Sequence, residues 1–179
     1  MGLFSKKPQA PNYDQEDCIV KKQRMREIFN ETVEDGDSYE ILYAYMTSSK
    51  FERGFIFDTN TTSFYYYIVG HRRSDFDVVL IQVDSQLGEH TDACPIEMDK
   101  VVNVSYEPKY HQLCFQYEKN YGIYGEILNI DGTGRDTKYG PKNIYQPEEI
   151  EKFLDFAEGF RSRLQQKGCK LDKWKRPSP

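Results

Sequence analysis

Two groups of basic residues in predicted turns are the side chains best suited to bind a ligand. His71, Arg72 and Arg73 are consecutive and follow a predicted strand, and Lys50 and Arg53 lie around the first predicted hairpin. Guanidinium and ammonium groups donate charge-assisted hydrogen bonds to carboxylates and phosphates. The alternative is that these turn residues are only solvated. We therefore predict a binding loop with these five residues as its candidates.

A tryptophan among cations near the C-terminus predicts contact with a membrane. Residues 170–176 carry four basic residues and one acidic residue around the single tryptophan of the chain. Indole rings lie at the headgroup level of a bilayer, and nearby cations attract anionic lipid. The membrane-contact candidates are Lys173, Trp174, Lys175 and Arg176. A solubilising tail without a partner is the alternative interpretation.

The sequence contains no recognisable catalytic or metal-binding motif, so we expect a protein that is not an enzyme and has no metal or cofactor. The histidines are His71, His90 and His111. His90 and Cys94 are four residues apart, but a zinc site needs further ligands from elsewhere. No Gly-x-Ser-x-Gly nucleophile motif is present. A hydrolase or transferase is a remote alternative, which requires one of these histidines beside a carboxylate or a cysteine in a pocket.

The charge and the apolar pattern of the chain exclude several kinds of partner. The 179 residues include 24 basic and 29 acidic side chains, and the net charge of −5 repels the phosphate backbone of nucleic acids. No apolar run approaches the roughly 18 residues of a membrane span, and no apolar run follows the N-terminal lysines as in a secretory signal. The four cysteines form no Cys-x-x-Cys pair, which is typical of reduced thiols. We expect a cytoplasmic protein of bacterial type, peripheral at most at the inner face of the membrane.

The periodicity of apolar residues predicts a helix followed by seven strands. Residues 1–14 are predicted to be a flexible tail, and residues 15–33 carry an apolar stripe at helical spacing. From residue 38 the period changes to two, which is typical of strands joined by short turns. Both faces of the first strand carry apolar groups, so we expect it to be covered on both sides. Strands are predicted over residues 38–46, 53–58, 63–69, 76–83, 98–106, 110–118 and 121–128, with turns at 47–50 and 59–62 and a loop at 84–95.

A long loop and an amphipathic helix complete a single domain over residues 15–168. The loop, residues 129–146, contains Gly132 and Gly134 without the Lys-Ser/Thr pair of a phosphate-binding loop. A helix is predicted over residues 147–167, after which 169–179 form a basic flexible tail. Its apolar stripe recurs at i, i+3, i+4 and i+7 spacing and consists of Ile150, Phe153, Leu154, Ala157, Phe160 and Leu164.

This order of elements resembles that of pleckstrin-homology-like domains, in which a C-terminal helix plugs one end of a bent seven-stranded sheet. The resemblance covers about residues 38–168. It implies an α+β, mainly β fold: a seven-stranded antiparallel bent sheet or partly open barrel capped by a C-terminal amphipathic helix, here with an additional N-terminal helix. Lipid-binding members carry several basic residues around the first hairpin, whereas this chain has Lys50 and Arg53 with Glu52 between them.

The predicted function is that of a non-catalytic intracellular binding or scaffolding module. A groove beside the final helix, or an exposed strand edge, would hold a protein partner. The basic tails would add weak attachment to an anionic membrane surface. The alternative is a small-ligand-binding β-barrel carrier, in which tyrosines surround an apolar molecule. Nucleic acid is not expected among the partners.

Overall fold

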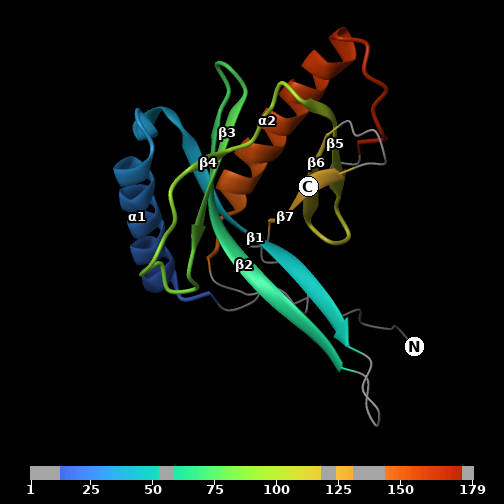
Figure 1. Ribbon diagram of the computed structural model, residues 1–179. Coiled ribbons are helices and arrows are strands. Elements are labelled where there is room, and N and C mark those ends of the chain that lie inside the picture. Colours follow the sequence, from blue (N-terminus) through green and yellow to red (C-terminus); the bar gives the residue numbers. More distant parts are fainter. Residues whose placement is uncertain (1–12, 53–58, 118–123, 131–143, 175–179) are drawn as a thin grey trace, which may run out of the picture.

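The fold is an open antiparallel sheet with one helix on each face. The computed structural model describes residues 13–52, 59–117, 124–130 and 144–174. Seven strands form one sheet in the order β4-β3-β2-β1-β7-β6-β5, and all neighbours are antiparallel (Figure 1). The sheet does not close, and the predicted α+β, mainly β class with two helices is confirmed. The elements are α1 (Gln15–Thr32), the short 3-10 helix η1 (Gly36–Ser38), β1 (Glu40–Glu52), β2 (Thr59–Arg72), β3 (Asp77–Val83), β4 (Cys94–Pro95), β5 (Val101–Glu107), β6 (Gln112–Tyr117), β7 (Tyr124–Asn129) and α2 (Pro147–Gln166).

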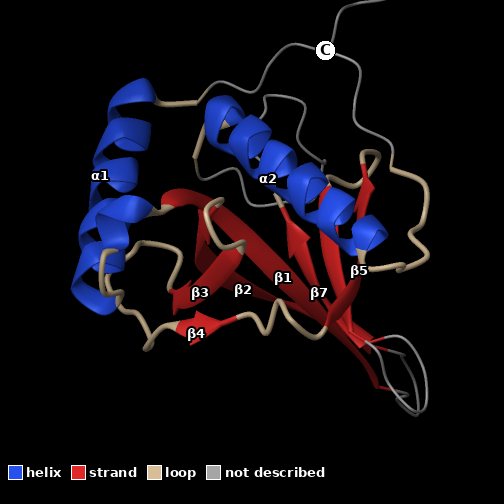
Figure 2. Ribbon diagram, turned by 90° about the horizontal axis from the view of Figure 1, so that it is seen from above, coloured by secondary structure: helices blue, strands red, loops and turns tan. Residues whose placement is uncertain are grey.

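Alternate residues of β1 point toward opposite helices. Leu42 and Ala44 lie in the core beneath α2, whereas Tyr43 lies in the core beneath α1. Figure 2 shows α2 lying across the sheet, with α1 at the end of the sheet where β3 and β4 lie. Because successive side chains of a strand alternate between its faces, burial on both faces requires apolar residues at nearly every position. The predicted cover on both sides is therefore confirmed for residues 42–45, whereas Glu40 is exposed and Ser38 belongs to η1.

An aromatic ring over a glycine holds α1 against the sheet. Phe29 is fully buried, and its ring centroid lies 5.4 Å from that of Tyr39. A Cβ atom added at Gly70 of β2 would overlap the Phe29 ring. The close approach of α1 to β2 thus depends on glycine at this position. An ion pair between Lys22 Nζ and Glu149 Oε1, 2.6 Å apart, also joins α1 to α2.

Two buried side-chain amides hold the sheet together where its two halves separate. Within the described residues, β1 pairs with β7 at Tyr45 and Asn129 alone, and Asn129 Nδ2 donates to the Tyr45 carbonyl over 2.9 Å. Gln146, directly before α2, is 1% exposed. Its Oε1 accepts from the Tyr43 backbone N–H over 2.8 Å, and its Nε2 donates to the Tyr43 carbonyl over 2.6 Å. The Gln146 amide therefore takes the place of a neighbouring strand and fixes the start of α2 against β1.

The turns predicted at residues 47–50 and 59–62 are wrong, because both segments belong to strands. β1 continues through the first segment and β2 through the second, with Ser49 directly opposite Thr62. Within these two segments, every side chain that the structure describes is exposed. Their polarity therefore reflects solvent on both faces of the strands and does not mark a turn, since serine and threonine form favourable cross-strand pairs.

Seven strands lie within the described residues, and one of them, β4, was not predicted. β4 pairs with β3 inside the segment 84–95 that was predicted to be a loop. The strand predicted over residues 53–58 lies outside the described residues. β4 contains Pro95, which lacks an N–H donor and is tolerated because this strand is at the edge of the sheet.

We expect Gln146→Leu to lower the free energy of unfolding by about 2–4 kcal/mol, because it leaves the buried N–H and carbonyl of Tyr43 without these partners. Urea denaturation followed by circular dichroism measures the change. Gln165→Leu is the matched control, since Gln165 is exposed on α2, and its effect should stay within about 0.5 kcal/mol. Equal losses of stability in both variants would contradict this role of Gln146.

Candidate functional site

The predicted binding-loop residues occupy two distant places. His71 and Arg72 end β2, and Arg73 begins the turn to β3. Lys50 lies ten positions along β1 from the residue that pairs with His71, which is about 33 Å at roughly 3.3 Å a residue. Arg53 lies outside the described residues. The structure therefore groups His71, Arg72 and Arg73 and separates Lys50 from them.

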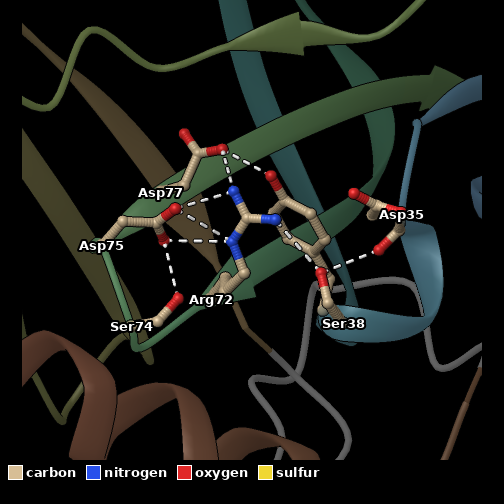
Figure 3. Close-up of polar contacts among 7 residues, drawn as sticks. Asp35, Ser38, Arg72, Ser74, Asp75 and Asp77 are labelled. Carbon is tan, nitrogen blue, oxygen red and sulfur yellow. Dashed lines mark hydrogen bonds and ion pairs between the residues drawn. The ribbon is translucent and has the colours of Figure 1, made fainter.

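Arg72 holds the turn between β2 and β3 against the start of β1 (Figure 3). Its guanidinium donates to both carboxylate oxygens of Asp75 over 2.7 to 3.0 Å, and to Ser38 Oγ over 3.1 Å. The guanidinium carbon lies 4.4 Å from the ring centroid of Tyr39, whose hydroxyl donates to Asp77 over 2.5 Å. A bidentate pair of this kind fixes geometry as well as charge. Arg72 is thus engaged in the structure, and a ligand would have to break these contacts to reach it.

These contacts change the pKa values of the groups around Arg72. The hydrogen bonds from Arg72 lower the pKa of the Asp75 carboxyl, which keeps it ionised. Burial, together with the hydrogen bond to Asp77, raises the pKa of Tyr39 to about 12. Tyr39 is therefore a neutral donor at neutral pH, and two carboxylates surround one guanidinium.

A cavity of about 470 Å³ lies between α2 and the β2–β3 turn. Its wall includes four charged residues besides Arg72, namely Arg73, Lys152, Glu40 and Asp155. Lys152 Nζ lies 3.0 Å from Glu40 Oε2, so this cation is paired. Arg73 is exposed and has no hydrogen bond or ion pair with the rest of the described chain. Arg73 is therefore the uncommitted cation at this cavity.

His71 lines the cavity together with Phe156 of α2 and packs against two aromatic rings of that helix. Its ring centroid lies 5.0 Å from those of Phe153 and Phe156. Burial lowers the pKa of His71 to about 4, so the imidazole is uncharged at neutral pH. Its Nε2 atom is buried, and no hydrogen bond joins His71 to a carboxylate or cysteine of the described chain. The turn position predicted for His71 is wrong: the residue belongs to β2, on the face that α2 covers.

Three charged residues of this cavity, Glu40, Lys152 and Asp155, were not among the predicted site residues. Lys152 and Asp155 lie three residues apart on α2, and their spacing places them on one side of the helix beside Phe153 and Phe156. Helical periodicity could have shown this shared side. No sequence pattern identifies the β2–β3 turn as the element that faces it, because that depends on how α2 packs on the sheet.

The predicted membrane-contact tryptophan packs on the domain. The ring centroid of Trp174 lies 5.9 Å from that of Tyr106 in β5, and 5.1 Å from the guanidinium carbon of Arg161 in α2. Its indole Nε1 is buried without a hydrogen-bond partner in the described chain. Cys169, Leu171 and Trp174, in the segment predicted to begin a flexible tail, pack against the core beneath α2.

The cations near Trp174 are only partly described. Lys173 is exposed, and Lys175 and Arg176 lie outside the described residues. Membrane contact through these residues stays a prediction, and Trp174 would have to leave Arg161 to reach lipid. Among the described residues, neither helix combines the length and the apolar character needed to cross a bilayer.

A buried arginine anchors the C-terminal segment. Arg161 is 6% exposed and donates to the carbonyl of Val104 in β5 and to the carbonyl of Asp172, the latter over 2.5 Å. Asn103 Nδ2 also donates to Asp172 Oδ2 over 2.7 Å. Burial lowers the pKa of Arg161. Since a buried guanidinium requires polar partners, Arg161 favours the docked position of this segment.

The other histidines take part in no metal cluster of the described chain. His90 is exposed, with Nδ1 3.2 Å from a backbone carbonyl, and Cys94 is exposed in β4. His111 lies in the turn before β6, with φ 52°. No group of three or more His, Cys, Asp or Glu side chains in the described ranges is placed to hold a metal ion. Most of the long loop, residues 131–143, lies outside those ranges.

Comparison with known proteins gives no family for this chain. No family model and no curated protein matches it. Among solved structures it is similar to the hSac2 domain from human phosphoinositide phosphatase Sac2, with a TM-score of 0.35 and 10% sequence identity, over 93% of each chain. At this TM-score the similarity establishes neither a common fold nor a common function.

We expect the stability difference between wild type and Tyr39→Phe to shrink as the pH rises from 10 to 12. At neutral pH the variant should be less stable by about 1 kcal/mol, because it lacks the hydrogen bond to Asp77. In this pH interval unfolded Tyr39 releases its proton before folded Tyr39, so the wild type loses stability as the pH rises. The other tyrosines affect both proteins equally. Urea denaturation across this range measures the difference, and a constant difference would contradict the raised pKa.

Trp174 is the single tryptophan, so its fluorescence reports the docking of the C-terminal segment. We expect Arg161→Met to weaken docking by about 1–3 kcal/mol, because the carbonyls of Val104 and Asp172 lose their donor. Emission should move to longer wavelength, and acrylamide should quench it more strongly. Arg163→Met, an exposed position of α2, is the control. Emission identical to the wild type in Arg161→Met would show that Arg161 does not hold this segment.

Proposed function

We propose that the protein is a non-catalytic intracellular binding module that holds a segment of a partner protein in the cavity between α2 and the β2–β3 turn. The observation that carries the proposal is the uncommitted Arg73, since its neighbours Arg72 and Lys152 are paired with carboxylates. Arginine and aromatic side chains are enriched at protein interfaces and supply much of their binding energy. Arg73 is the exposed arginine of this cavity.

The cavity favours a partner segment that presents one carboxylate. The planar guanidinium of Arg73 matches a carboxylate in a bidentate contact. His71 and Phe156 border the cavity, but they are 3% and 1% exposed and offer an apolar group little ring surface. The volume of about 470 Å³ lies in the usual range of ligand pockets. Glu40 and Asp155 also line the cavity, and they disfavour a ligand with several negative charges.

The kind of fold, the alternative of a small-ligand carrier and attachment to a membrane also bear on this proposal. The order of seven strands followed by α2 supports a fold of the pleckstrin-homology-like kind. A small-ligand carrier has less support, because the sheet is open and separate cores fill its two faces. Attachment to an anionic membrane through residues 173–176 would be an additional property of the same module.

Selection from a random peptide library displayed on phage, with the full chain as bait, tests the proposal. We expect enriched peptides to share an acidic residue. Fluorescence anisotropy then measures the affinity of a labelled synthetic peptide. Arg73→Glu should weaken binding about tenfold or more, which corresponds to about 1.4 kcal/mol, because one carboxylate then faces another.

Lys167→Glu is the matched control for charge. Lys167 is exposed at the end of α2, about 22 Å along the helix from Lys152. This variant should bind the peptide as the wild type does. Equal affinity of the wild type and Arg73→Glu would contradict the proposal, as would a selection without enriched peptides.

A further inference from the structure

The outer halves of β1 and β2 form a two-stranded ribbon that stands clear of both helices (Figure 1). The ribbon consists of residues 46–52 and 59–65, which are paired along their whole length. Side chains 47–51 and 60–65 are all exposed, including Phe51 at 63% and Phe64 at 39%. A two-stranded ribbon in water is marginally stable without a further strand. The ribbon therefore gains stability from any strand added to its edge.

The β2 edge of the ribbon is open to such a strand. Within the described chain, β3 pairs with β2 only from Tyr66 onward, and β7 reaches β1 only at Tyr45. Natural edge strands are commonly protected by charged side chains, proline or a bulge. The sequence of residues 59–65, Thr-Asn-Thr-Thr-Ser-Phe-Tyr, has no charge and no proline, whereas the β1 half carries Lys50 and Glu52. Its uniform pairing with β1 also shows no bulge.

We propose that residues 59–65 pair with the same residues of a second copy of this chain, antiparallel about a two-fold axis at Thr62. In this register Thr61 lies opposite Ser63, and Asn60 opposite Phe64, of the second copy. Threonine and serine pairs of this kind stabilise antiparallel strands. A two-fold contact joins one patch to itself, so an uncharged strand meets no like charge across the axis.

The charge of the protein favours contact between copies at the ribbon. The chain has a net charge of −5, so two copies repel, whereas the ribbon sequence carries one lysine and one glutamate. Thr62 lies ten residues along β2 from Arg72, which is about 33 Å. The Debye length at physiological ionic strength is about 8 Å. A contact through the ribbons therefore keeps the charged bodies beyond the range of their repulsion.

The expected dimer is weak. A single pair of seven-residue strands buries less than the roughly 1,200 Å² of a stable interface, so association should depend on protein concentration. The ribbon is separate from the cavity at Arg73. The inference thus stands independently of the proposed function, and either can fail alone.

Sedimentation equilibrium of the full chain, over about two decades of protein concentration, tests the proposal. We expect reversible monomer–dimer association of the wild type. Thr62→Lys and Thr62→Glu should each weaken it about tenfold or more, because two like charges then meet at the axis. An equimolar mixture of the two variants should associate again, since opposite charges now pair.

Ser49→Lys is the matched control. Ser49 lies opposite Thr62 on β1 and is equally exposed, but it is one strand farther from the axis. The two substituted positions in a dimer would be about 14 Å apart, beyond the Debye length, so association should persist. Circular dichroism confirms that each variant is folded. A wild type that stays monomeric would overturn the proposal, and so would loss of association in Ser49→Lys but not in Thr62→Lys.

Discussion

The bidentate contact between the Gln146 amide and the backbone of Tyr43 is the constraint that fixes α2 on the sheet. At this point β1 is buried beneath α2, and β7 does not yet run beside it. A buried backbone N–H and carbonyl must find partners. Gln146 supplies both from the residue directly before α2. The same contact therefore completes the sheet and determines where the helix begins.

The position of the candidate cavity follows from that starting point. With α2 fixed at its first turn, Phe153 and Phe156 lie against His71 near the end of β2. Arg72 binds Asp75 of the following turn and stacks on Tyr39, so it holds this turn against the residue that precedes β1. The two adjacent arginines thus have different roles. Arg72 is engaged by Asp75 and Tyr39, whereas Arg73 is exposed beside the cavity.

The fold could largely be predicted from periodicity, and the exceptions have physical causes. The stripe of α2 and the alternation in β5 and β6 are strong because each of these elements has one face in the core beneath α2. Residues 47–50 have no apolar face, since the ribbon is exposed on both sides, and periodicity could not distinguish them from a turn. The two-residue strand β4 is too short to carry any pattern.

The candidate site could be predicted only in part. The charges of residues 71–73 indicated a binding loop, but their separate roles depend on tertiary contacts. Burial of His71 follows from strand parity, once β2 is known to continue to Arg72. A tryptophan among cations has the same sequence pattern at a membrane and against a protein core. In this protein the contact of Trp174 with Arg161 distinguishes packing on the core from membrane contact, and Arg161 is a charged residue on the buried side of α2.

The narrow junction between β1 and β7 has a consequence for the order of folding. β1 to β3, and β5 to β7, each pair with neighbours in the sequence, whereas the junction joins Tyr45 to Asn129 across 84 residues and Tyr43 to Gln146 across 103. Contacts between distant residues require closure of a large loop and slow folding. We therefore expect two meanders to form early, each as a cooperative unit, and the junction to form last. In the reverse order the junction would open first on unfolding, and the core beneath α2, to which both meanders contribute, would open with it.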